Sequence, residues 1–174
     1  VHFYGWIEED WSSGQLTIRH HNPVTVLAVP YDMPVVGYDT VNVDRLRMWS
    51  AQSPKQLDMA SFNQGQYMRA MEEQELAEVI SKVLYPEDNH YAGRELRLKQ
   101  QYFFASASVQ YALKDFEETY GPRWDRLPEK VAIHINDTHP GLAIPEMMRI
   151  LMDEKGLAWD RAARICQGVF AYTN

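Results

Sequence analysis

Residues 131–146, VAIHINDTHPGLAIPE, decide the fold class of this chain, because an apolar run passes there into a polar loop and then into a helix. The apolar run at 131–135 is typical of a buried strand that is covered on both faces. Pro140 and Pro145 fit the start of a helix, where a proline removes only amide donors that lack helical partners. The stretch therefore predicts a strand-loop-helix unit of an α/β fold.

The loop of this unit predicts a ligand site. Ligands of α/β proteins bind outside the carboxyl ends of the strands, and four polar residues stand at that end: Asn136, Asp137, Thr138 and His139. These side chains favour a polar pocket over a packed core. A metal hydrolase site built from His134, Asp137 and His139 is a weaker alternative, since His134 lies inside the strand and the spacing is irregular.

The chain divides into three sections that together predict an α/β fold. Residues 1–50 alternate apolar and polar positions between turn signals, which predicts a β-rich section. Residues 61–118 carry two long segments with apolar residues near helical spacing, joined by a polar loop at 85–93. Residues 131–174 read as strand, helix, helix and strand, and this order of elements is typical of α/β proteins.

The two helical segments differ in their expected burial. Residues 61–84, with Asn63 as the N-cap, fit one long helix or two shorter ones. The Met and Tyr stripe of this segment favours a packed core, with a dimer contact as the alternative. Residues 94–118 have a wide apolar surface, which predicts a largely buried helix that ends at Gly121-Pro122.

Composition bears on partners and compartment. A formal net charge of -7 and a pI of about 5.3 argue against nucleic acid, because no cluster of Lys and Arg overrides that total. No apolar run approaches the roughly 20 residues that span a membrane. Cys166 is the only cysteine, which favours the cytoplasm, and we expect it to pack inside a helix. Both ends of the chain interrupt strand-like runs, so we expect a piece of a longer polypeptide.

A second polar group, Asp88, Asn89 and His90, lies in the loop between the helical segments. Amide, carboxylate and imidazole side chains beside Tyr85 and Tyr91 would suit polyhydroxyl ligands, because each hydroxyl both donates and accepts hydrogen bonds. A solvated turn explains the same residues equally well. Side-chain chemistry alone therefore predicts a polar pocket that is compatible with carbohydrate.

Six segments of the sequence closely resemble the α-glucan phosphorylases that act on glycogen, starch or maltodextrin. They run in order along nearly the whole chain: VHFYG at 1–5, PYDMPVVGY at 30–38, RLRMWSA at 45–51, VLYPEDN at 83–89, ELRLKQQYF at 95–103 and NDTHPGLAIPEMMRIL at 136–151. The resemblance implies that residues 1–174 are part of the N-terminal Rossmann-like domain of a GT-B type glycosyltransferase. It also implies that the C-terminal cofactor domain lies outside this chain.

The resemblance implies an activity for the full-length protein. The family releases glucose 1-phosphate from α-1,4-glucans with inorganic phosphate, and it carries pyridoxal phosphate on a lysine whose position is not in this chain. The expected partners are therefore α-1,4-glucan and inorganic phosphate, and the fragment alone is expected to be inactive. A non-catalytic carbohydrate-binding module derived from the same fold is the alternative.

By matching position, the resemblance also implies five site residues. Asp88 and Asn89 fall in the loop that gates the catalytic cleft, where the Asn contacts the sugar next to the phosphate. Asp137 and His139 resemble residues that face the glucan, and Arg97 resembles a positively charged neighbour of the cleft. No residue of this chain corresponds to the cofactor site.

Regulation is implied in part. The helix near 67–80 resembles the one through which the family forms a homodimer and which leads into the gating loop, so movement there could shift the loop. His90 stands where many members have Phe, which speaks against stacking of planar inhibitors. Lys114-Asp115 replaces two arginines of the AMP-activated animal enzymes, so AMP activation is not expected.

Overall fold

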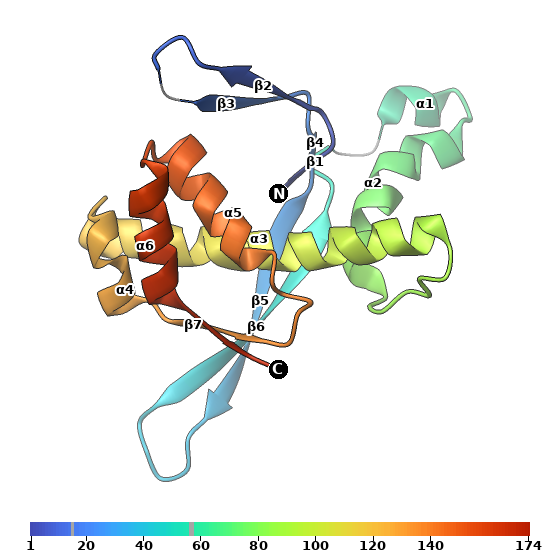
Figure 1. Ribbon diagram of the computed structural model, residues 1–174. Coiled ribbons are helices and arrows are strands. Elements are labelled where there is room, and N and C mark those ends of the chain that lie inside the picture. The colour runs from blue at the N-terminus through green and yellow to red at the C-terminus, as the bar shows by residue number, and fades with distance from the viewer. Residues whose placement is uncertain (15, 56–57) are drawn as a thin grey trace. The chain divides into compact units, whose positions relative to one another are not determined.

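The computed structural model describes residues 1–14, 16–55 and 58–174 and contains both strands and helices (Figure 1). The prediction of a mixed α/β protein is therefore confirmed. Gln15, which falls in the expected β-rich section, lies outside the described residues.

The chain forms two compact units. The first unit contains residues 1–3 and 24–100, and the second contains residues 4–23 and 101–174. Each sheet among the described residues has two strands. In the part of the chain that the structure describes, no helix has the length and apolar character needed to cross a membrane.

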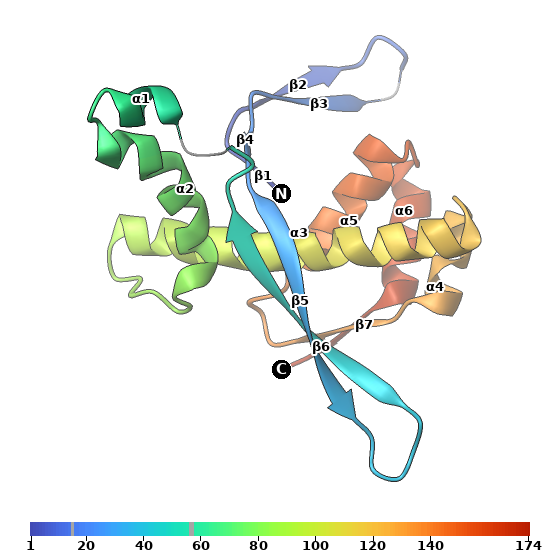
Figure 2. The ribbon, with the colours of Figure 1, turned by 180° about the vertical axis from the view of Figure 1, so that it is seen from behind.

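The first unit holds two antiparallel strand pairs. β1 (His2–Phe3) pairs with β4 (Val24–Thr25), and β5 (Leu27–Val36) pairs with β6 (Val43–Gln52). The β5–β6 pair is a long hairpin, and Figure 2 shows its two strands twisting about each other, as strands of L-residues do. The strands expected for the start of the chain are thus present as antiparallel pairs.

A charged pair on one face of this hairpin supports its register. Asp32 lies opposite Arg47 on the neighbouring strand. The Arg47 guanidinium donates two hydrogen bonds of 2.6 Å to the Asp32 carboxylate and holds the pKa of that carboxyl below its usual value. Bidentate pairs of this kind are geometrically specific, so a slip in register would break both bonds.

Two helices follow the hairpin in the first unit, α1 (Met59–Asn63) and α2 (Tyr67–Lys82). The Asp58 side chain caps α1 by accepting hydrogen bonds from the backbone of residues 60 and 61. Gly65, with a φ of 76°, separates the two helices, because this left-handed conformation favours glycine. The two-helix alternative is confirmed, whereas Asn63 as the N-cap is wrong: Asn63 is the last residue of α1.

The apolar stripe of α2 is mostly exposed. The buried residues are Ala70, Ala77 and Ile80, and the larger apolar side chains are exposed to solvent: Tyr67, Met68, Met71, Leu76 and Val79. Assigning this stripe to a packed core is therefore wrong for the structure described. The helix α2 contacts α1 and β6, and only Ala70, Ala77 and Ile80 of its apolar residues are buried.

The long helix α3 (Tyr91–Tyr120) begins three residues before the expected helix and ends two residues after it. Tyr91, Ala92 and Gly93, which the sequence assigned to the loop, thus form its first turn. Gly121 terminates the helix, as the sequence predicted: it has a φ of 73° and its amide donates to the Glu117 carbonyl at 2.9 Å. Burial is concentrated in the middle of the helix rather than along all of it.

The second unit has a helical core around one parallel strand pair. β7 (Ile133–Asn136) pairs with β8 (Phe170–Thr173). The remaining helical elements are η1 (Trp124–Arg126), α4 (Leu127–Lys130), α5 (Ala143–Arg149), the π-helical η2 (Ile150–Glu154) and α6 (Trp159–Val169). The strand-helix-helix-strand order expected from the sequence is therefore present, with a π-helical segment extending the first helix.

The strand expected at 131–135 is covered on one face only. Ile135 is buried and Ile133 is half-buried against the helical core, whereas Ala132 and His134 are exposed. Coverage on both faces is therefore wrong for this structure. Side chains alternate along a strand, so the core of the unit contacts one set only.

Two further features complete the second unit. β2 (Trp6–Asp10) and β3 (Thr17–His21) form an antiparallel hairpin. Cys166 lies buried in α6, as expected, and burial raises the pKa of its thiol to about 11. The thiol is therefore protonated and unreactive at neutral pH.

Candidate functional site

The α2–α3 loop, residues 83–90, is fastened to α3 of the first unit by two side chains. Gln100 Nε2 donates to the Val83 carbonyl oxygen at 2.7 Å. The Arg97 guanidinium lies over the ring of Tyr85, 4.1 Å from its centre, which is a favourable cation–π contact. Both contacts involve residues on one side of α3, so the start of the loop is held against that helix.

The end of the loop is fixed by His90 and Gly93. His90 Nδ1 accepts a hydrogen bond of 2.9 Å from the Gly93 amide, which makes His90 the N-cap of α3. A Cβ on Gly93 would collide with the Glu87 carbonyl oxygen. The backbone of the loop therefore packs against Gly93 so closely that any other residue there would force the loop or the helix to move.

Asp88 and Asn89, expected to be sugar-contacting residues, lie between these two anchors. Both are exposed. The Asn89 amide donates to Glu87 Oε1 at 2.6 Å. Arg97, the third expected residue of this unit, is half-buried and contacts the loop through Tyr85. The structure therefore brings Asp88, Asn89 and Arg97 into one loop-and-helix segment.

The β7–α5 loop, residues 137–142, carries the other expected residues. Asp137 has a φ of 67°, which Asp tolerates better than most residues because its short side chain bonds locally. Its carboxylate accepts from the Thr138 amide at 2.6 Å, and its own amide donates to the Thr173 carbonyl of β8 at 2.8 Å. The chain therefore turns sharply at the end of β7.

His139 is exposed and lies two residues after Asp137 on the same loop. A carboxylate and an imidazole so placed can accept and donate hydrogen bonds to sugar hydroxyls. Asp137 and His139 lie in the second unit, whereas Asp88, Asn89 and Arg97 lie in the first.

The metal alternative lacks a site in the described structure. His134 lies in β7, and its Nε2 is 2.7 Å from Thr173 Oγ1. Across residues 1–14, 16–55 and 58–174, no three His, Cys, Asp or Glu side chains are grouped so that they could hold a metal ion. His134 is therefore a strand residue with a neighbouring hydroxyl as its partner.

One buried charged residue near this loop has no counterpart in the sequence analysis. Glu146, in the first turn of α5, is 3% exposed and pairs with Arg149 three residues later. The sequence does contain a signal for this ion pair: Glu146 lies inside an apolar stretch, and Arg149 follows at a spacing that places both side chains on one helical face. Its partners on α3 come from distant sequence and could not be identified in advance.

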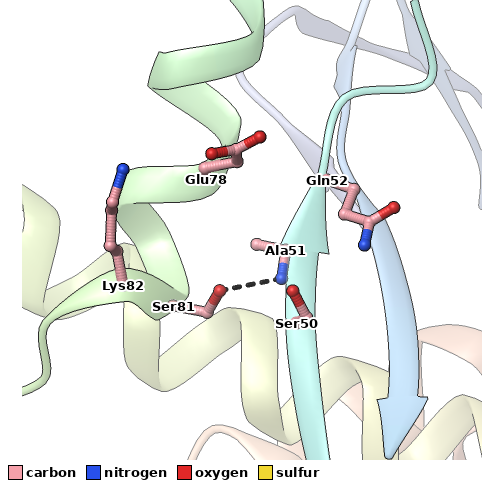
Figure 3. Close-up of a pocket in the computed structure, with 6 residues that line it drawn as sticks. All are labelled: Ser50, Ala51, Gln52, Glu78, Ser81 and Lys82. Carbon is pink, nitrogen blue, oxygen red and sulfur yellow. Dashed lines mark hydrogen bonds between the residues drawn. The ribbon is translucent and has the colours of Figure 1, made fainter.

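The first unit also has a polar hollow, and none of the residues that line it is an expected site residue. It is lined from β6 by Ser50, Ala51 and Gln52, and from α2 by Glu78, Ser81 and Lys82 (Figure 3). The Ala51 amide donates to Ser81 Oγ at 2.8 Å across it. This bond joins α2 to the edge of β6 and explains the hollow as a packing feature.

Comparisons with known proteins address the whole chain. A family model described as carbohydrate phosphorylase matches residues 1–174. The chain is 44% identical to the liver form of glycogen phosphorylase from Bos taurus, 45% to the brain form from Bos taurus and 46% to the muscle form from Mus musculus.

Each alignment covers 100% of this chain and 21% of the relative, so the chain spans about a fifth of the length of the curated relatives it matches. A similarity of this extent, over every element described above, does not arise from one shared motif. The chain belongs to the carbohydrate phosphorylase family.

Proposed function

We propose that residues 1–174 are part of the N-terminal, Rossmann-like domain of a GT-B type α-glucan phosphorylase. The full-length enzyme would release glucose 1-phosphate from α-1,4-glucans by phosphorolysis. The observation that carries this proposal is the family match over the whole chain, with identity of 44–46% to glycogen phosphorylases. We take the fragment alone to be inactive, because it spans 21% of those relatives.

Five residues would serve the sugar side of the reaction. We assign Asn89 to the sugar next to the phosphate and Asp88 to the gate of the cleft. Asp137 and His139 would face the glucan, and Arg97 would hold the gating loop through Tyr85. The support is that the four polar residues on the loops are exposed and that each loop is anchored at both of its ends.

Pyridoxal phosphate is the cofactor that the family implies, and the residues described here do not fit it. Four of the six lysines form ion pairs with carboxylates, which would repel the cofactor phosphate. Lys130 lies over the ring of Tyr120, and Lys82 lies beside Glu78 at the hollow on α2. We therefore assign the cofactor to a part of the enzyme outside residues 1–174.

The exposed face of α2 would be a homodimer contact in the cytoplasmic enzyme. Large apolar side chains on a helix surface mark interaction sites when they form a contiguous group, and α2 exposes Tyr67, Met68 and Met71 together with Leu76. Met68→Glu should shift the full-length protein from dimer to monomer in analytical ultracentrifugation. Gln74→Glu, an exposed polar position on the same helix, is the control and should leave the dimer intact.

The catalytic assignment is tested by Asn89→Ala in the full-length enzyme. Loss of a polar partner of the bound sugar should cost about 1 to 3 kcal/mol of transition-state binding. The measurement is kcat/KM for maltoheptaose with inorganic phosphate, followed by release of glucose 1-phosphate. Asn63→Ala at the exposed end of α1 is the matched control. Equal rates for the wild type and Asn89→Ala would remove Asn89 from the site.

The same assay addresses the fragment. The purified 174-residue chain with maltoheptaose and phosphate should produce no glucose 1-phosphate, and turnover would contradict its assignment as an incomplete part. A full-length protein that binds maltoheptaose without phosphorolysis would instead be a carbohydrate-binding module.

A further inference from the structure

Glu146 is a buried carboxylate to which the proposed function assigns no role. It lies in the first turn of α5 and is 3% exposed. Burying an ionised carboxylate is unfavourable unless the group is paired and hydrogen-bonded. The groups that surround Glu146 therefore define what it can do.

Four donors surround the two carboxylate oxygens. Ser106 Oγ donates to Oε1 at 2.6 Å, and the Tyr102 hydroxyl donates to Oε2 at 3.1 Å. Arg149 supplies the other two bonds, from Nη2 to Oε1 at 3.0 Å and from Nε to Oε2 at 2.8 Å. A bidentate guanidinium with two hydroxyls fixes both the position and the plane of the carboxylate.

The partners are ordered in turn. Gln110 Nε2 donates to Ser106 Oγ at 2.9 Å, so the hydroxyl hydrogen of Ser106 is left for Glu146. Arg149 Nη1 also donates to Glu154 at 2.9 Å. Burial raises the pKa of Glu146, but the hydrogen bonds from Arg149 and Ser106 outweigh burial and hold that pKa below its ordinary value. Glu146 is therefore ionised at neutral pH.

This network ends beside the loop that carries Asp137 and His139. The Glu146 amide donates to the carbonyl of Leu142, the last residue of the β7–α5 loop, at 3.1 Å. At the other end of the loop, the Asp137 amide donates to Thr173 of β8. A loop of this length has few conformations once both of its ends are fixed, because loop-closure geometry is most restrictive for short, stiff loops.

We propose that Glu146 is a positioning residue, which fixes the start of α5 on Ser106 and Tyr102 of α3 and thereby sets the loop that presents Asp137 and His139. Glu146 does not contact the glucan, since it is buried and both of its oxygens are occupied by side chains of the protein. The inference rests on the proposed function, because the loop is assigned there to the sugar side of the reaction.

The test uses Glu146→Gln in the full-length enzyme. The amide keeps the size of the side chain but cannot accept four hydrogen bonds or pair with the Arg149 charge. Hydrogen exchange of the peptide covering residues 137–142 should become faster, and kcat/KM for maltoheptaose should fall roughly ten- to hundredfold, as a displacement near 1 Å does. KM for phosphate should stay unchanged. Ser106→Ala removes one bond and should shift both readouts in the same direction by less, which keeps the test valid if Glu146→Gln does not fold.

The matched control is Glu117→Gln, which removes the 2.7 Å bond from Lys155 to another carboxylate of α3 in the same unit. It should leave exchange of the β7–α5 loop unchanged. If Glu146 has a purely structural role, Glu146→Gln should lower kcat in proportion to the folded fraction and leave both KM values and the exchange of the loop unaltered. That result would overturn the proposal. Loop exchange is independent of activity: a wild-type enzyme that releases no glucose 1-phosphate refutes the proposed function, while the exchange data still decide the positioning role.

Discussion

Replacing Gly93 by alanine should displace the α2–α3 loop while leaving α3 intact. Gly93 is buried in the first turn of α3, and a Cβ there would overlap the Glu87 carbonyl oxygen so deeply that ordinary contact requires a shift on the order of 1 Å. The loop rather than the helix should move, because α3 is a continuous helix of 30 residues and Glu87 is exposed. Asp88 and Asn89 follow Glu87 directly and would move with it.

The expected change in activity is large and the expected change in stability is small. A displacement near 1 Å at a group that positions substrate can cost up to roughly a hundredfold in rate. Helix propensity acts in the opposite direction, since alanine is favoured over glycine by about 1 kcal/mol inside a helix. We therefore expect kcat/KM of the full-length enzyme for maltoheptaose to fall roughly tenfold or more, while Tm changes by no more than about 4 °C.

Steady-state phosphorolysis and scanning calorimetry of the same preparations measure both quantities. Ala92→Ser is the control, because Ala92 is the exposed neighbour of Gly93 in the same helical turn and should change neither value. Two results would refute the reasoning. An unchanged kcat/KM would mean that the loop position does not matter for the sugar, and a large fall in Tm would mean that the helix rather than the loop absorbs the collision.

Three predictions concern the second unit and α3. Leu151→Ala should cost about 2 to 5 kcal/mol in urea unfolding because Leu151 is fully buried, whereas Leu98→Ala at an exposed position should cost less than about 0.5 kcal/mol. Cys166 should react with iodoacetamide roughly a hundredfold more slowly in the native than in the unfolded chain, because burial raises the pKa of its thiol to about 11 and the thiolate is scarce at pH 8. The pKa of Glu146 is lower in the folded than in the unfolded protein, so its contribution to stability is present above the unfolded value of about 4.3 and is lost as pH falls through the folded value. Glu146→Gln should therefore flatten the acid side of the stability profile.

The strand-loop-helix unit could be predicted because its signals are local. An apolar run, a polar loop and a proline in the first turn of α5 are separated by a few residues and need no distant partner. Gly121 at the end of α3 is predictable for the same reason, since a positive φ after a helix favours glycine. The position of the loop that carries Asp137 therefore follows from the sequence alone, whereas the loop that carries Asp88 ends three residues earlier than the sequence predicted.

The anchors of those loops could not be predicted in this way. Gln100 lies 17 residues from Val83, and Ser106 lies 40 residues from Glu146. Nothing in the local pattern of a helix indicates which of its polar side chains will donate to a distant segment. Glu146 shows the same difficulty. From the sequence alone, a glutamate on this helix would be predicted to be exposed to solvent, and its burial is understood only once the donors on α3 are known.

The apolar stripe of α2 shows a different limit of prediction from sequence. Here the difficulty is not that the partners are distant in the sequence but that two kinds of surface have the same pattern. Hydrophobic periodicity indicates that one face of a helix is apolar. Burial of that face in a protein core and burial in a subunit interface both produce this pattern. The structure separates the two by side-chain size, since Ala70 and Ala77 face the unit while Tyr67 and Met68 face solvent. Ile80 is buried beside these alanines, so one apolar stripe is divided between a buried and an exposed face, and the periodicity alone does not show where that division falls.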